Sequence, residues 1–459
     1  MGGSFSAKGY AALWRWHFYA GLFTAPFLVI LAVTGAIYLF NDELNDWIYP
    51  ELRFAPSGDR IQPAGELVAA VRRRYPDATV TRIDMPVAAG RTAMAFVTPQ
   101  QGEGQGEPFR AFVDPGDGTV LGDVIYTDTL VGFADRMHGS LLLGERGDAI
   151  VELAASWALV LVITGLCLWW PRGRRKGRAL RFDPRPKGRG RWRELHRLVG
   201  AYTAVMIVFL IITGLPWASF WGDRVLSPAS NALGLGYPPE LRHHGGGESK
   251  TLLDTLGEAP WALQQAPLPN AASPAAHHGH HQGNPPPANL DTSTAAINRV
   301  HRLLAARDLA LGYRLSIPQT ADEPYSAYTY PPRPEGQRTL HVDSGADSLL
   351  MEVTFDDYGA IAKAVEYGVA LHMGNYFGRA NQIVMLIPCL AIVALVITGT
   401  LMWWRRRPLG GFGAPPAKAP MRKRYLLAVT LTLLVLLPLA GLSLIVVLTV
   451  EKIARWKKE

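Results

Sequence analysis

The chain has 459 residues, a formal net charge of +8 and 49% hydrophobic residues. Its mean hydropathy is positive, and its apolar residues are gathered in long stretches, which excludes an ordinary soluble protein of this size. The two cysteines, Cys167 and Cys389, both fall in apolar stretches, so neither a disulfide framework nor a thiolate metal site is expected.

Five apolar stretches are long enough to cross a bilayer, which needs about 20 apolar residues. The first is too long for a cleaved signal peptide and lacks a small-residue cleavage site, so we expect it to remain as a helix. In chain order the predicted spans are Phe18–Phe40, Leu153–Trp170, Leu198–Trp221, Ile383–Trp404 and Tyr425–Val450.

Positive charge is concentrated between these stretches. Residues 172–193 carry eleven Lys/Arg and one acid, and residues 405–424 carry seven Lys/Arg and no acid. Residues 41–137 and 222–371 are instead more acidic than basic. Because short basic loops stay in the cytoplasm, this pattern predicts a cytoplasmic N-terminus and two external segments, and it explains the basic runs without nucleic acid. A fifth span disagrees, since it places the basic end "EKIARWKKE" outside.

The chain contains the same pattern twice. His17 precedes Thr34 by 17 residues, and His196 precedes Thr213 by 17. The second predicted span repeats in the fourth, "HGSLLLG…ITGLCLWW" matching "HMGNYFG…ITGTLMWW" without a gap. Each half therefore reads as helix, external segment, helix, and both halves start on the same side, which indicates a parallel repeat about an axis along the membrane normal.

The external segments also repeat. Each has a short amphipathic helix pattern followed by alternating strands with tight Asp- and Gly-containing turns, which predicts two small α+β modules. A Pro- and His-rich insert at about 240–290 precedes the second module and includes "HHGHH" (277–281); we interpret it as a flexible linker, with loose Cu or Zn binding as the alternative.

The predicted fold class is thus an α-helical membrane protein with five spans in a duplicated arrangement and two external α+β modules. Its predicted segments are a first span at 10–41, a module at 42–137, an external approach and second span at 138–171, a basic loop at 172–193, a third span at 194–222, an external segment with the insert and second module at 223–371, an approach and fourth span at 372–404, a basic loop at 405–424 and a fifth span at 425–450.

Four histidines lie at equivalent positions of the repeat. His17 and His196 begin the first and third spans on the inner side, and His138 and His372 precede the second and fourth spans on the outer side. A twofold axis brings equivalent residues together, so each pair can hold a haem iron from both sides. An interfacial role for single histidines and a zinc or copper site remain alternatives.

Glycines accompany the inner histidines. Gly21 and Gly200 lie one turn from His17 and His196 on the same helix face, where a missing side chain lets a flat macrocycle approach the backbone. Gly35 and Gly214 lie 18 residues from those histidines, which returns to the same face and predicts space for a second group. His138 stands well before its span, and a break at Gly144 or Gly147 is needed to fold it back.

The pattern "WRWHFYAGL…TG…YLF", an external module and then "HGSLLLG…TGLCLWWP" resembles the PepSY-associated transmembrane proteins of bacterial inner membranes, over about residues 10 to 407. The resemblance implies a b-type dihaem protein, with two haem b per chain, that passes electrons outward to a periplasmic ferric siderophore. It assigns the four histidines as the axial ligands. This chain departs from the pattern in its insert, its fifth span and its lack of a fused flavin domain.

We therefore expect an inner-membrane haem-dependent ferric reductase with no separate catalytic residue. No nucleotide-binding motif follows a strand, so a cytosolic flavin reductase or a quinone would be the electron donor. The expected surroundings are membrane lipid, and nucleic acid is not an expected partner. Two alternatives come from other classes: a membrane-anchored module that binds a protein and carries no haem, and a metal transporter or sensor that uses the His-rich insert.

Overall fold

The computed structural model describes residues 7–99, 106–170, 180–238, 251–253, 259–269, 290–408, 410–411, 413–415 and 423–456. The chain divides into two compact units. The membrane unit comprises residues 1–39, 134–226 and 372–459, and the sheet unit comprises residues 40–133 and 227–371. The "HHGHH" cluster, with most of the predicted insert, and residues 172–179 of the first basic loop lie outside the described residues.

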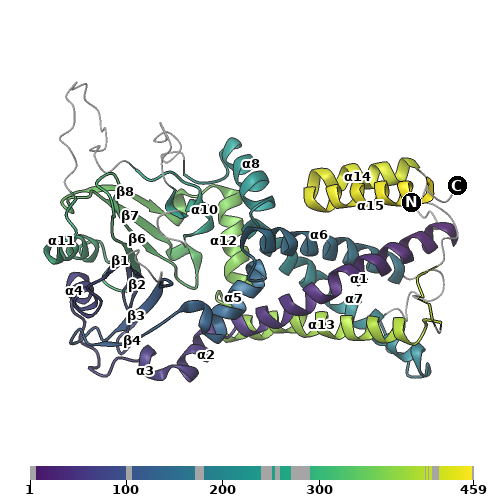
Figure 1. Cartoon of the computed structure of the whole chain (residues 1–459), viewed down its shortest axis with the longest axis horizontal. Coiled ribbons are helices and arrows are strands. Elements are labelled where there is room, and N and C mark those ends of the chain that lie inside the picture. The colour runs from purple at the N-terminus through teal and green to yellow at the C-terminus, as the bar shows by residue number, and fades with distance from the viewer. Residues whose placement is uncertain are drawn as a thin grey trace. The chain divides into compact units, whose positions relative to one another are not determined.

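Four helices of the membrane unit are long and apolar enough to cross a membrane, which confirms the first four predicted spans. α1 contacts α6 and α13, and α7 also contacts α6 and α13, so the four helices form a ring of neighbours (Figure 1). Helices suit this environment because they satisfy every backbone hydrogen bond internally. Their bounds are α1 (Ala7–Tyr38), α6 (Gly144–Trp169), α7 (Arg189–Gly214) and α13 (Arg379–Trp404).

The fifth predicted span is not one helix. α14 (Lys423–Leu436) has 14 residues, a length of about 21 Å that falls short of a bilayer core of about 30 Å. The chain then reverses, and α15 (Pro438–Trp456) runs back beside α14 (Figure 1). Pro438 accounts for the break, because proline lacks the backbone N–H that a continuing helix needs. The single span predicted for Tyr425–Val450 is therefore corrected to a helical hairpin.

The hairpin packs against α6 and the end of α7. Leu433, Leu437, Ala440 and Leu444 form its buried side, together with Leu215. The tip of the hairpin is capped, since the Trp221 indole N–H donates to the carbonyl of Leu436 at 2.9 Å. A helix-end carbonyl left unpaired in an apolar environment is costly, so this bond stabilises the chain reversal.

The sheet unit contains one eight-stranded antiparallel sheet, with strand order β4-β3-β2-β1-β5-β6-β7-β8 (Figure 1). The two predicted modules are therefore not separate: β1 pairs with β5, and Ile83 lies opposite Leu315. The modules merge because each leaves one edge strand whose backbone groups need a partner. The strands are β1 (Ala78–Asp84), β2 (Ala93–Pro99), β3 (Phe109–Val113), β4 (Val120–Val124), β5 (Tyr313–Ser316), β6 (Tyr325–Thr329), β7 (Arg338–Val342) and β8 (Leu349–Thr354).

Two amphipathic helices, α4 (Ala64–Arg74) and α11 (Thr294–Ala305), pack on one face of the sheet and on each other. Their close crossing depends on Gly65, where an added Cβ would lie 2.3 Å from the carbonyl oxygen of Thr294. Shorter α-helices among the described residues include α2 (Asn41–Ile48), α3 (Pro50–Arg53), α5 (Leu130–Ser140), α8 (Ser227–Ala232), α10 (Trp261–Gln264) and α12 (Ala360–His372).

Candidate functional site: two histidine pairs

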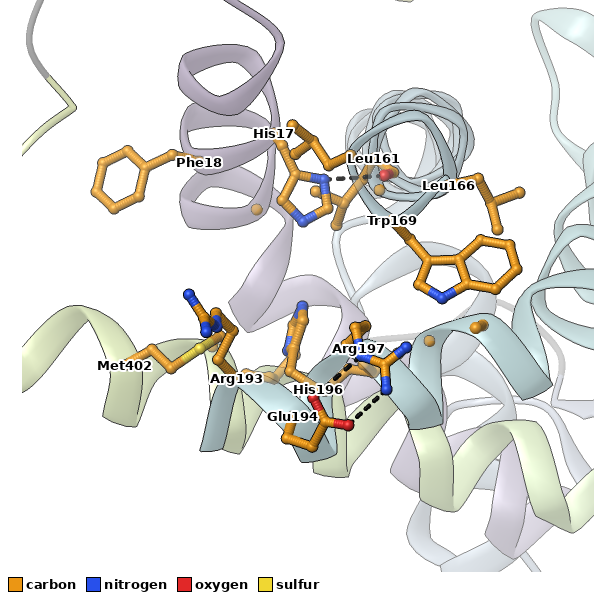
Figure 2. Close-up of a pocket in the computed structure, with 18 of the residues that line it drawn as sticks. His17, Phe18, Leu161, Leu166, Trp169, Arg193, Glu194, His196, Arg197 and Met402 are labelled. Carbon is orange, nitrogen blue, oxygen red and sulfur yellow. Dashed lines mark hydrogen bonds and ion pairs between the residues drawn. The ribbon is translucent and has the colours of Figure 1, made fainter. Parts of the chain in front are cut away.

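His17 of α1 and His196 of α7 face each other and form the first histidine pair. Their ring centroids are 6.3 Å apart and their planes are nearly perpendicular, at 88°. Figure 2 shows both rings reaching into the same space from different helices. The sequence-based expectation that these two residues meet is thus fulfilled in the structure.

His138 of α5 and His372, the last residue of α12, form the second histidine pair, and they are close enough to interact electrostatically. Both reach the spanning helices. The Nδ1 atom of His138 lies 3.1 Å from Thr34 Oγ1 of α1, and that of His372 lies 2.8 Å from Thr213 Oγ1 of α7. The outer histidines are therefore held by the first and third spans, on which the inner histidines stand.

A break in the chain allows this arrangement. α5 ends at Ser140 and α6 begins at Gly144, and between them Leu141 and Leu142 have φ values of 51° and 58°. Gly144 itself has φ 58°, so no right-handed helix continues through it. The break predicted near Gly144 is confirmed, and the other candidate, Gly147, lies inside α6.

Each of the four histidines has a threonine hydroxyl beside its Nδ1 atom, and the Nδ1 of His17 also lies 3.1 Å from the carbonyl oxygen of Leu161 (Figure 2). The Nδ1 atom of His17 lies 3.1 Å from Thr164 Oγ1, and that of His196 lies 2.9 Å from Thr398 Oγ1, as with the second pair and Thr34 and Thr213. Each threonine hydroxyl already donates to the backbone carbonyl four residues earlier, at 2.7 to 2.8 Å; the donations run from Thr34 to Ile30, from Thr164 to Val160, from Thr213 to Phe209 and from Thr398 to Ala394.

This pattern favours one tautomer. A hydroxyl whose single hydrogen is committed to a carbonyl offers only lone pairs, so Nδ1–H of each histidine is the donor and the threonine is the acceptor. The proton therefore sits on Nδ1, and Nε2 keeps the lone pair that binds a metal. A hydrogen bond to the remote ring nitrogen is the usual support of a metal-bound histidine.

The residue after each threonine is a glycine that packs against the same ring. An added Cβ would lie 3.0 Å from His17 Cε1 at Gly165 and 3.1 Å from His138 Cε1 at Gly35. At Gly399 and Gly214 the equivalent distances, to the rings of His196 and His372, are both 3.6 Å. A Thr-Gly step thus positions each ring. The threonine holds the ring by a hydrogen bond, and the glycine leaves the space that the ring occupies.

The structure places both sets of glycines singled out in the sequence. Gly35 and Gly214, predicted to leave space for a second group further along the seam, pack against the rings of His138 and His372 of the second pair. Gly21 and Gly200 border the cavity of the first pair, where an added Cβ would make only ordinary contacts, 3.5 Å to Leu161 and 3.6 Å to Leu395. Sequence reasoning recorded the constant His-to-Thr intervals but not that each threonine serves a histidine from another helix.

A cavity of about 1500 Å³ surrounds the first pair, larger than the 300–1000 Å³ typical of small-molecule pockets. Its walls are mainly apolar and aromatic, and include Trp14, Phe18, Ile207 and Trp403. A metal bound at about 2 Å from each Nε2 would put the two ring centroids roughly 6 Å apart, which agrees with the 6.3 Å observed. The residues present therefore fit a flat, largely apolar metal macrocycle.

Comparison with known proteins is consistent with this geometry. The family model described as the PepSY-associated TM region matches residues 14–406, a range that contains all four histidines and the four threonines. No curated protein is similar enough in sequence to count as a match. Because the family model covers well over half of the chain, this membrane protein belongs to the PepSY-associated TM region family.

Proposed function

We propose that the chain is a b-type dihaem oxidoreductase of the bacterial inner membrane that passes electrons from the cytoplasmic side to a periplasmic ferric complex, a ferric siderophore, and so releases iron for uptake. One observation carries the proposal. Four histidines in two pairs each donate Nδ1–H to a threonine and pack on the adjacent glycine, which leaves four Nε2 atoms free to bind metal.

In this proposal His17 and His196 hold one haem b, and His138 and His372 hold the other. Bound haem supplies reversible one-electron transfer, with a potential that the two axial imidazoles and their surroundings set. The protein contributes ring orientation through the Thr-Gly steps, and a cavity around the first pair whose lining is mainly apolar.

The two pairs are spaced to serve opposite sides of the membrane. On α1 the ligand His17 and the support Thr34 of the second pair are 17 residues apart, which is about 25 Å along a helix. A bilayer core is about 30 Å thick, so the pairs lie near its two faces. The two halves would be related by an axis along the membrane normal, with a cytoplasmic N-terminus and basic loops inside.

The reaction needs one electron for each ferric ion. A cytosolic flavin reductase or a quinone would be oxidised on the inner side, and Fe(III) in the external complex would be reduced to Fe(II). The oxygen ligands of a siderophore hold the smaller, more highly charged Fe(III) far better than Fe(II), so reduction favours release of the metal.

The deciding experiment is an absorption spectrum of the detergent-purified chain, oxidised and then reduced with dithionite, with haem quantified per chain after growth with ample haem. A sharp low-spin b-type spectrum with two haems per chain is expected. A colourless protein would refute the proposal and favour the membrane-anchored binding module instead. Metal binding that is lost on deletion of residues 259–289 but survives His17→Ala would favour the transporter or sensor.

A further inference from the structure

Arginines gather on one side of the cavity of the first histidine pair. Of the described residues that line it, six are arginines and two are acids, so this side carries an excess of positive charge. The arginines are Arg181, Arg185, Arg189, Arg193, Arg197 and Arg406, and the acids are Asp183 and Glu194. The apolar residues of the same cavity form its remaining walls.

The two acids are already engaged. Glu194 forms an ion pair with Arg197, with 2.5 Å between Oε1 and Nη2, as the dashed line in Figure 2 shows. It also accepts a hydrogen bond from the backbone N–H of Asp183, whose own carboxylate accepts from the backbone N–H of Arg185. These carboxylates therefore leave the other arginines uncompensated within the described part of the cavity.

The guanidinium groups of Arg189 and Arg193 make no hydrogen bond or ion pair with any residue that the structure describes, and both residues are exposed. They are four residues apart on α7, and Arg193 is three residues before His196, so all three share one face of the helix. Figure 2 shows Arg193 reaching from α7 into the space that the His196 ring also enters. Two unpaired guanidinium groups thus stand beside the first pair.

A third guanidinium reinforces the positive charge. Arg406 follows α13, stacks on Trp14 with 4.6 Å between its Cζ and the ring centroid, and donates from Nη2 to the carbonyl of Gly413 at 2.6 Å. Burial and the nearby Arg189 guanidinium lower the pKa of Arg406. Arg406 therefore adds positive charge on the side of the cavity where Arg189 lies.

We propose that Arg189 and Arg193 bind the two carboxylates of the haem held between His17 and His196. This inference rests on the proposed function and adds an orientation to it. Haem b has two carboxylate side chains on one edge and is apolar elsewhere, and the cavity is lined both by arginines from the start of α7 and the segment before it and by apolar side chains. A guanidinium binds a carboxylate through two parallel hydrogen bonds, so it fixes direction as well as adding affinity.

The test compares Arg193→Gln and Arg189→Gln with Arg191→Gln. Arg191 is exposed, as Arg189 and Arg193 are, and lies on the same helix, but it does not line the cavity, so its variant removes the same charge from the same segment. Each full-length protein is loaded in detergent with haem b or with haem dimethyl ester, in which both carboxylates are neutral. The rate of haem loss to excess apomyoglobin is measured, together with the midpoint potentials.

With haem b, Arg193→Gln and Arg189→Gln should each lose the haem of the first pair about 3- to 10-fold faster than wild type, because each removes one charge-assisted contact at an exposed position. Arg191→Gln should stay within about twofold of wild type on the same principle. With the dimethyl ester the three variants should match wild type. One midpoint potential should fall in the two cavity variants only, since a lost positive charge favours the oxidised form.

Two outcomes would overturn the assignment: haem b leaving Arg193→Gln and Arg191→Gln at equal rates, or an effect of Arg193→Gln that persists with the ester. In both, two haems per chain with a low-spin spectrum would leave the dihaem proposal intact. A chain that retains no haem would refute the dihaem proposal and this inference together, so the two failures are distinguishable.

Discussion

The Nδ1–H of His196 donates to the hydroxyl of Thr398, 2.9 Å away on α13, while that hydroxyl donates to the carbonyl of Ala394. The threonine hydroxyl is held by the backbone of its own helix, and it thereby fixes the orientation of an imidazole that belongs to another helix. Four such contacts occur in the membrane unit, two in each half of the chain.

Thr398→Val should loosen the first histidine pair. Valine keeps the shape of threonine but accepts no hydrogen bond, so the His196 ring loses the contact that fixes its tautomer. Supports of this kind are typically worth about 10- to 100-fold in metal affinity, so one haem per chain should become easily lost while the other is retained. Haem content after dilution and gel filtration measures this.

The matched control for that variant is Thr430→Val. Thr430 is also a buried threonine whose hydroxyl donates to a carbonyl four residues earlier, that of Leu426 at 2.8 Å, but it lies on α14. It should retain both haems. Equal haem loss from the two variants would mean that the Thr398 hydroxyl is not a specific support of His196.

Substitutions of the four histidines should separate the two sites. His17→Ala or His196→Ala should remove one haem, and His138→Ala or His372→Ala should remove the other, because each haem needs both of its imidazoles. The reduced spectra of the two groups should differ and should sum to that of the wild type. His301→Gln, in the sheet unit, should keep two haems per chain; wild-type haem content in all four alanine variants would contradict the ligand assignment.

Gly165→Ala and Gly399→Ala change equivalent positions of the repeat but should differ in their effect on haem occupancy. The new methyl group would lie 3.0 Å from Cε1 of His17 in the first variant, and 3.6 Å from Cε1 of His196 in the second, an ordinary contact. Gly165→Ala should therefore displace the His17 ring and lower occupancy of the first pair, whereas Gly399→Ala should stay close to wild type. A spectrum with haem quantification on both variants would show it, and identical behaviour would argue against ring packing on Gly165.

The C-terminal hairpin predicts that both of its ends lie on the same side of the membrane. A reporter that fluoresces only in the cytoplasm, fused after Pro420 or after Glu459, should give the same signal in both positions. Opposite signals would restore a continuous fifth span. Trp221→Phe removes the indole N–H that caps the Leu436 carbonyl. The variant should lower the free energy of unfolding by about 1 kcal/mol and leave the reporter signal unchanged.

The sheet unit should lose stability on mild acidification. His341 is 3% exposed, its Nδ1 lies 2.9 Å from Ser326 Oγ, and burial lowers its pKa from 6.5 to about 4. Above pH 6.5 the ring is neutral in both states and the full stability is present. Between pH 6.5 and pH 4 the unfolded state binds a proton that the folded state resists, so stability falls by about 3 kcal/mol in total and then levels off.

Hydrogen exchange of β6 and β7 amides in the full chain, measured at several pH values, reports this loss. His341→Gln removes the titrating group, so the variant should show a smaller fall over the same window, although its stability at pH 7 will also change. A fall as steep as in the wild type would assign the pH dependence to other groups.

The sequence predicted which histidines form pairs, but not which threonines hydrogen-bond to them. Equal His-to-Thr intervals in both halves are enough to bring His17 to His196 under a twofold axis. They do not indicate that Thr34 serves His138 and Thr164 serves His17. The number of residues between a histidine and a threonine describes positions on one helix only. Which histidine a threonine contacts depends on which neighbouring helix that threonine faces.

Two larger features were also beyond sequence patterns. The apolar run from Tyr425 to Val450 reads as one span because hydropathy sums side chains and ignores the missing N–H of Pro438. The pairing of β1 with β5 joins strands far apart in the chain, and alternation along a strand describes its faces rather than the partner at its edge. The lysines of "EKIARWKKE" were the one signal against a fifth span, and they agree with the hairpin.

Each half of the chain carries one histidine of each pair together with the Thr-Gly step that supports it. Neither half completes a pair alone, and two copies of one half, joined symmetrically, would complete both. A shorter ancestral gene would thus have gained two sites from a single self-association. Fusion of two such copies would make that association permanent and let them diverge; Glu145 in one half corresponds to Arg379 in the other.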